Sequence, residues 1–116
     1  MEASKALLPA NKFGELDIRM GTIIDCHHFD DARKPAYKIW IDFGSDIGIK
    51  KSSAQLTTSY RIDQLLGKQV CAVINLEPRQ IGTFMSECLV IGALGPESQV
   101  ILLQTDQKVK DGSRIA

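Results

Sequence analysis

The chain has 116 residues, with 14 Lys and Arg against 14 Asp and Glu, so its formal net charge at pH 7 is zero. A hydrophobic fraction of 44% with 24% charged residues is typical of a folded domain and excludes disorder as the default. The longest apolar runs, such as Val100 to Leu103, are too short to span a membrane. The balanced charge excludes a generally polycationic nucleic-acid coat but leaves a locally basic face open.

The N-terminal part predicts an arm followed by one long strand. We expect a short helix over Asn11 to Leu16, with Asn11 as its N-cap. From Asp17 to Phe29, apolar and polar residues alternate as in a strand. One face of this strand carries Ile18, Met20, Ile24 and Cys26. Gly21 lies inside the run, where a glycine is typical of a bulge or of a sharp bend in a small barrel.

A charged loop, closed by Pro35, then leads into a predicted hairpin. Residues Tyr37 to Phe43 alternate as a second strand. Gly44 to Asp46 reads as a turn, and Ile47 to Ser53 as the third strand, paired with the second.

The remaining chain predicts one short helix and further strands. The apolar period changes over Thr57 to Leu66, which suits a short amphipathic helix with Thr57 or Thr58 as cap and Gly67 as its stop. The elements expected after it are a buried strand at Gln69 to Leu76, a long loop at Glu77 to Met85, a strand at Glu87 to Leu94 and a short strand at Val100 to Gln104.

This order of elements predicts an all-β fold. Three strands, a short helix and two strands are the order of the five-stranded OB-fold barrel. An SH3-like barrel is the rival, but it does not account for the helix between strands three and four. The absence of long helices between strands argues against a doubly wound sheet. We expect a single domain over residues 1–116, with the barrel core at about 13–94, an N-terminal arm and a C-terminal extension at 95–116.

Catalytic patterns are largely missing from the sequence. No glycine-rich phosphate loop is present. A metal site could be sketched from Cys26, His28 and Asp30, but the second ligand cluster that a zinc site needs is missing. We therefore expect no enzyme activity, no metal and no cofactor. The three cysteines form an odd, widely spaced set, which fits buried, reduced thiols rather than a disulfide framework. Reduced thiols in turn favour a cytoplasmic protein, and we expect no membrane partner.

Basic residues are placed where an OB barrel binds its ligands. Arg33 and Lys34 lie in the loop after the first strand, and Arg79 lies in the loop before the last. These two loops frame the ligand face of OB-folds, and strands two and three form its floor. Those strands carry Lys38, Trp40 and Lys50. An aromatic among lysines suits a stacking platform for unpaired nucleotides, and it equally suits solvated lysines around a tryptophan packed at an edge.

Three longer motifs resemble a known family. They are DIRMGTI at Asp17 to Ile23, IGIKKSSAQLT at Ile47 to Thr57 and NLEPRQIGTFMSECLVIGA at Asn75 to Ala93. Together they are similar to the tRNA-binding domain of the EMAP-II and methionyl-tRNA-synthetase C-terminal type, and most of all to its stand-alone CsaA branch. The resemblance implies an OB barrel, a homodimer joined through the N-terminal arm and the C-terminal extension, and contact with the outside corner of tRNA by shape and phosphate backbone.

The resemblance also implies site residues. Carried over by position, the polar motif residues are Ser52, Ser53, Gln55, Asn75, Arg79, Ser86 and Glu87. Ser86 and Glu87 have a structural alternative, in which they tie down the loop before them. The expected RNA-binding set is Arg33, Lys34, Lys38, Lys50, Ser53, Gln55, Asn75, Arg79 and Ser86.

Two functions follow from this resemblance. The first is a non-catalytic, tRNA-binding homodimer. The alternative is an export-related chaperone that holds unfolded precursor peptides on apolar surface, with Phe84 and Met85 as candidate contacts. The apolar seam expected between subunits comprises Leu7, Leu8, Val100 to Leu103 and Val109.

Overall fold

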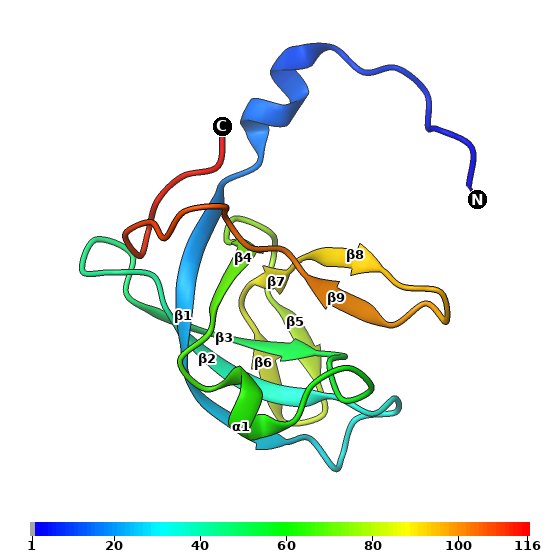
Figure 1. Ribbon diagram of the computed structural model, residues 1–116, viewed down its shortest axis with the longest axis vertical. Coiled ribbons are helices and arrows are strands. Elements are labelled where there is room, and N and C mark those ends of the chain that lie inside the picture. The colour runs from blue at the N-terminus through cyan, green and yellow to red at the C-terminus, as the bar shows by residue number, and fades with distance from the viewer. Residues whose placement is uncertain (1) are drawn as a thin grey trace.

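The computed structural model describes residues 2–116, and a curved antiparallel sheet forms its centre (Figure 1). The sheet has five strands in the order β3-β2-β1-β4-β7. Its members are β1 (Ile18–His28), β2 (Tyr37–Asp42), β3 (Ile49–Ala54), β4 (Gln69–Val73) and β7 (Leu89–Val90), with the short helix α1 (Ile62–Leu65) between β3 and β4. The predicted order is confirmed, and the fold is an all-β barrel of the OB type.

The barrel interior is filled by side chains that alternate along β1 and β2. Ile23, Ile39 and Ile41 are fully buried, and Phe43 is 1% exposed. Gly21 faces this interior, where a Cβ would lie 2.6 Å from Phe43 Cδ1. The glycine therefore makes room for the phenyl ring.

The predicted bulge lies three residues later than Gly21. Thr22 and Ile23 pair with consecutive residues of β2, and the register then skips Ile24 before Asp25 pairs with Trp40. Ile24 is consequently 48% exposed, and Cys26 turns into the interior. The extra residue in β1 reverses which side of the strand faces the interior. The single apolar face expected for Ile18, Met20, Ile24 and Cys26 therefore does not continue past Ile24.

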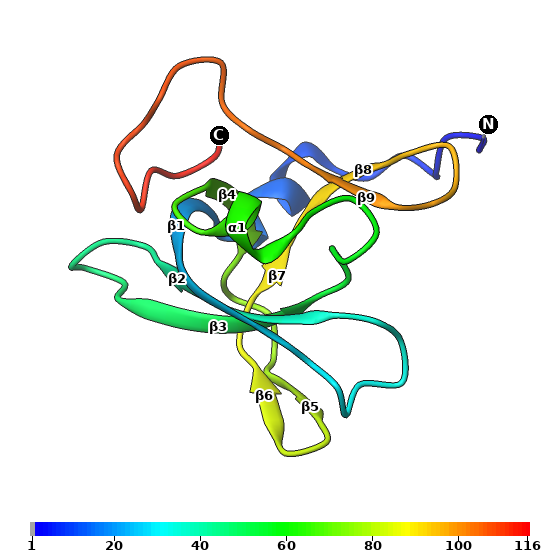
Figure 2. The ribbon, with the colours of Figure 1, turned by 60° about the horizontal axis from the view of Figure 1, so that its bottom comes forward.

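Two segments differ from the expected elements. The expected loop at 77–85 contains a β-hairpin, formed by β5 (Arg79–Ile81) and β6 (Phe84–Ser86), which projects from the barrel (Figure 2). The expected strand at 87–94 is divided into β7 and β8 (Gly92–Leu94), and β8 pairs with β9 (Val100–Leu102) as a second projecting hairpin (Figure 1).

The helix α1 is also shorter than expected. Residues 57–59 form a turn, and Arg61 rather than a threonine is the N-cap residue. The Gln64 side chain accepts a hydrogen bond of 2.9 Å from the Arg61 backbone N–H. Gly67, with a φ of 82°, ends the helix as the pattern predicts.

The C-terminal tail and the segment that precedes β1 meet at the start of β1. A 3-10 helix, η1 (Ala10–Glu15), precedes β1, and the arm before it extends away from the barrel (Figure 1). The C-terminal tail returns to β1, where the Met20 N–H donates to the Ser113 carbonyl and the Ile115 N–H to the Ile18 carbonyl. Val109 and Ile115 pack on this strand. Much of the extension that we expected at a subunit seam therefore covers its own barrel.

Candidate nucleic-acid interface

A groove of about 690 Å³ lies between the β1–β2 loop, the end of β3 and the hairpin strand β5. Its lining contains five of the residues predicted to bind RNA, which are Arg33, Lys34, Ser53, Gln55 and Arg79. Ala32, Ala36 and Ile81 supply its apolar lining. The loop and the hairpin project at the same end of the barrel in Figures 1 and 2. We call this feature the basic groove.

The cations of the basic groove are free to meet an anion. Arg33, Lys34 and Arg79 are exposed, and none of them forms an ion pair within residues 2–116. Two arginines outside the groove differ in this respect, because Arg19 pairs with Asp17 and Arg61 with Asp63. Three uncompensated positive charges around one concave surface favour phosphate groups as the ligand.

The edge of β3 is closed by side chains rather than by a full strand. Glu87 accepts a hydrogen bond of 3.0 Å from the Lys51 N–H through Oε1, and its own N–H donates to the Lys51 carbonyl at 2.8 Å. Ser86 Oγ accepts one of 3.1 Å from the Ser53 N–H. These bonds attach the β5–β6 hairpin to the barrel and so hold Arg79 beside Ser53. They correspond to the structural alternative for Ser86 and Glu87.

The outer face of β2 and β3 carries a cluster of rings and lysines. Phe84 from β6 covers it, with its ring centroid 5.4 Å from that of Phe29 and 5.9 Å from that of Trp40. The Lys38 Nζ lies 4.8 Å from the Phe29 ring centroid, and the Lys51 Nζ lies 5.1 Å from that of Phe84. Trp40 is thus packed edge-to-face against Phe84, as in the structural alternative to a stacking platform.

Two predicted residues take other positions in this region. Phe84 is only 5% exposed and so offers little surface to a peptide, while Met85 beside it is half-buried. Lys50 has the parity of the buried Ser52, on the side of the sheet opposite to Lys38. Its neighbour Lys51 occupies the ring cluster instead. The register of β3 against β2 decides which of the two neighbouring lysines faces the rings, since Lys51 pairs with Trp40 and Lys50 with Ile41.

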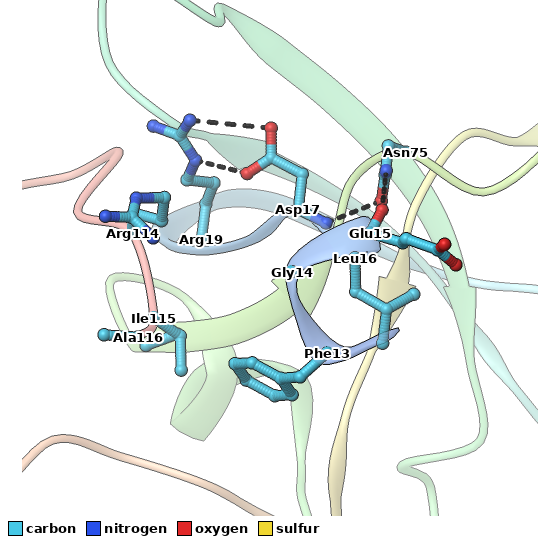
Figure 3. Close-up of a pocket in the computed structure, with 10 residues that line it drawn as sticks. All are labelled: Phe13, Gly14, Glu15, Leu16, Asp17, Arg19, Asn75, Arg114, Ile115 and Ala116. Carbon is cyan, nitrogen blue, oxygen red and sulfur yellow. Dashed lines mark hydrogen bonds and ion pairs between the residues drawn. The ribbon is translucent and has the colours of Figure 1, made fainter. Parts of the chain in front are cut away.

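Asn75 lies away from the basic groove, in a cavity of about 480 Å³ formed by both ends of the chain (Figure 3). Its Oδ1 accepts a hydrogen bond of 2.7 Å from the Asp17 N–H, and its Nδ2 donates one of 2.8 Å to the Glu15 carbonyl. Both ends of the amide therefore hold η1 against the start of β1. The structure does not bring Asn75 together with the other predicted RNA-binding residues.

The three cysteines are free and buried. Burial raises the pKa of Cys88 to about 12 and that of Cys26 to about 11, which keeps both protonated. Within residues 2–116, no three His, Cys, Asp or Glu side chains come together in a way that could hold a metal ion. In the same part of the chain, no helix has the length and apolar character needed to cross a membrane.

Fold and groove together define a small binding domain of the OB class, with its cations gathered beside the β1–β2 loop and the β5–β6 hairpin. A family model described as "Putative tRNA binding domain" matches residues 18–114, and the chain belongs to that family. The methionine–tRNA ligase of Methanococcoides burtonii is 31% identical over 96% of the chain. The chain spans only 16% of that enzyme's length.

Two solved structures have nearly the same fold over their full length. The crystal structure of chaperone CsaA from Bacillus anthracis has a TM-score of 0.90 and 39% identity, over 96% of this chain and 100% of that one. The CsaA chaperone protein of Picrophilus torridus has a TM-score of 0.89 and 44% identity, over 95% of this chain and 100% of that one. The chain is therefore a CsaA-type tRNA-binding domain protein.

Proposed function

We propose that this chain binds tRNA through the basic groove, by phosphate and shape contacts and without catalysing a reaction. The observation that carries the proposal is that Arg33, Lys34 and Arg79 line one groove and form no ion pair within residues 2–116. Phosphate contacts of this kind position an RNA on a protein. Membership of the tRNA-binding domain family supports the choice of ligand.

A salt titration of tRNA binding tests this proposal. Three phosphate contacts give a slope of log K against log salt of about −2.1 to −2.7, so affinity falls roughly 20- to 40-fold over a fourfold rise in salt. The measurement is fluorescence anisotropy of labelled tRNA at several salt concentrations. Affinity that does not change with salt, or no tRNA binding at low salt, would contradict the proposal.

We also propose that the chain forms a homodimer. The support is apolar surface on its two projecting parts: Leu7 is 99% exposed on the arm, and Leu94 is 65% and Ile101 40% exposed on the β8–β9 hairpin. Large exposed apolar patches typically mark an interface. Sedimentation analysis of Ile101→Glu should show a monomer, and Ile49→Glu, at an exposed β3 position outside the hairpin, should leave the mass unchanged. A monomeric wild-type chain contradicts the proposal.

A second candidate function is the holding of unfolded precursor peptides in protein export. It is favoured by the two CsaA structures, each of which is described as a chaperone. In this chain the peptide contacts would come from the exposed leucines of the arm and hairpin, because Phe84 is buried. Peptide binding that persists at high salt, with no retention of tRNA, would favour this function over the first. The free, buried cysteines fit a reducing compartment, and we propose a cytoplasmic location.

A further inference from the structure

Two polar side chains that line the basic groove have no hydrogen-bond partner within residues 2–116. The Ser53 hydroxyl and the Gln55 side-chain amide line the groove, and within residues 2–116 neither forms a hydrogen bond. By contrast, the side chains of Ser86 and Gln64 are hydrogen-bonded to backbone N–H groups. An unpaired hydroxyl and an unpaired amide in one groove offer donors and acceptors to a ligand.

The backbone that carries these two groups is held in place. The Ser53 N–H is bonded to Ser86 Oγ at 3.1 Å. Gln55 sits at the tip of a tight turn in which the Leu56 N–H donates to the Ala54 carbonyl at 2.9 Å. Leu56 and Ala54, on either side of it, are 2% and 8% exposed. The Gln55 side chain is therefore presented outward from a fixed point, so little order has to be gained on binding.

The shape of the groove favours a single nucleotide over the side of a helix. Its volume of about 690 Å³ is in the range of small-molecule sites, and it is bounded by the β1–β2 loop and by β5. A base that remains stacked in a duplex cannot enter such a concave site, whereas an unpaired base can. Arg33 and Arg79 border the groove from the loop and from β5, and a guanidinium plane can stack on a base as well as bind its phosphate.

We propose that the basic groove takes one unpaired nucleotide of the bound RNA, with Gln55 and Ser53 bonded to the edge of its base and Arg33, Lys34 and Arg79 on its phosphates. This inference rests on the proposed RNA-binding function and adds that the groove selects an unpaired nucleotide of the RNA. Gln55 is then a specificity-determining residue, since an amide can donate and accept to one base edge at once. The three cations bind any sequence.

Competition against labelled tRNA tests this assignment. The competitors are a single-stranded oligoribonucleotide of about ten nucleotides, a size that suits one OB-fold, and a blunt duplex of the same sequence. We expect the single strand to compete at least about tenfold better than the duplex, because the paired bases of the duplex cannot make the base contacts in the groove. A third competitor, an acidic unfolded peptide, should not displace the tRNA.

The variants separate base contacts from charge. Gln55→Ala should weaken single-strand binding about tenfold and leave duplex binding unchanged. Gln80→Ala is the matched control, because Gln80 is an exposed glutamine on β5 that bonds to the Gly82 carbonyl and does not line the groove. Both positions are exposed, so both variants should keep the circular dichroism spectrum of the wild-type chain.

Each other outcome overturns the inference in a recognisable way. Equal competition by single strand and duplex, with tRNA still bound, contradicts the unpaired nucleotide and leaves the proposed function standing. Displacement by the acidic peptide but not by the oligonucleotide assigns the groove to a peptide. The absence of any tRNA binding refutes the proposed function and this inference together.

Discussion

Glu87 closes the barrel beside the basic groove, and its replacement by alanine should destabilise the fold measurably. Its carboxylate accepts the Lys51 N–H at 3.0 Å on the edge of β3, where no strand within residues 2–116 pairs with β3 from that side. A hydrogen bond to a charged group contributes about 1.5–3 kcal/mol, and its removal leaves a half-buried N–H unpaired. We therefore expect Glu87→Ala to lower the free energy of unfolding by about 2 kcal/mol.

Urea unfolding, followed by the fluorescence of Trp40, measures this change. Trp40 is the single tryptophan and packs against Phe84 of the same hairpin, so its emission reports on this part of the barrel. With a urea m-value of about 1.5–2 kcal/mol/M, the midpoint should fall by roughly 1 M. Glu87→Gln keeps an oxygen acceptor, and we expect about half of the loss, since neutral hydrogen bonds contribute about half as much as charged ones.

Glu77→Ala is the matched control for this measurement. Glu77 lies in the same segment, is exposed and forms no hydrogen bond within the described residues 2–116. Its replacement should change the free energy of unfolding by less than about 0.5 kcal/mol. If Glu87→Ala is as stable as Glu77→Ala, the carboxylate does not close the barrel, and the reasoning that attaches the β5–β6 hairpin to β3 is refuted.

Three further predictions concern the packing, the arm and the thiols. Gly21→Ala should lower the free energy of unfolding in urea by about 1–3 kcal/mol, because its Cβ would overlap the Phe43 ring. Gly14→Ala is the control and should not lower it, because the space around a Cβ at Gly14 is open. Equal effects of the two substitutions would contradict the role of Gly21. Asn75→Ala removes both bonds that hold η1, so hydrogen exchange and proteolysis of the arm should become faster, and an unchanged arm would contradict that role. The pKa of Cys88 is about 12 in the folded protein, so the unfolded state loses its proton first, and stability should fall as pH rises above about 9. Cys88→Ala should make that decline in the urea midpoint shallower, and an identical pH dependence would contradict it.

Local sequence patterns were sufficient to predict the barrel, but they missed the β5–β6 hairpin. Apolar alternation indicates β1 and β2, the turn at Gly44 to Asp46 indicates β3, and a continuous apolar run indicates β4. The glycine that ends α1 is equally visible. The hairpin is only three residues on each side, and its signal is the pair Gly82-Thr83 between Ile81 and Phe84. Gly82 has a φ of 58°, as the tight turns of two-residue hairpins require.

The location of the basic groove was predictable, because the topology of an OB barrel fixes which loops lie together. The hydrogen bonds and the facing of individual side chains were not predictable from the sequence. Arg33, Lys34 and Arg79 come from the two loops that an OB barrel places together, and they line one groove. Asn75 is bonded to backbone 58 and 60 residues earlier in the chain, which no local pattern reveals. The side occupied by Lys51 depends on strand register in the same way, since a shift of one residue would exchange it with Lys50.

The salt dependence of tRNA affinity in two arginine variants tests the central claim most directly. Arg79 lines the basic groove, whereas Arg61 is an exposed arginine outside the groove lining that is paired with Asp63. If Arg79 meets a phosphate, Arg79→Ala should weaken binding and reduce the slope of log K against log salt by about 0.7–0.9, and Arg61→Ala should leave both unchanged. Parallel salt slopes for the wild-type chain and Arg79→Ala would show that RNA does not occupy the groove.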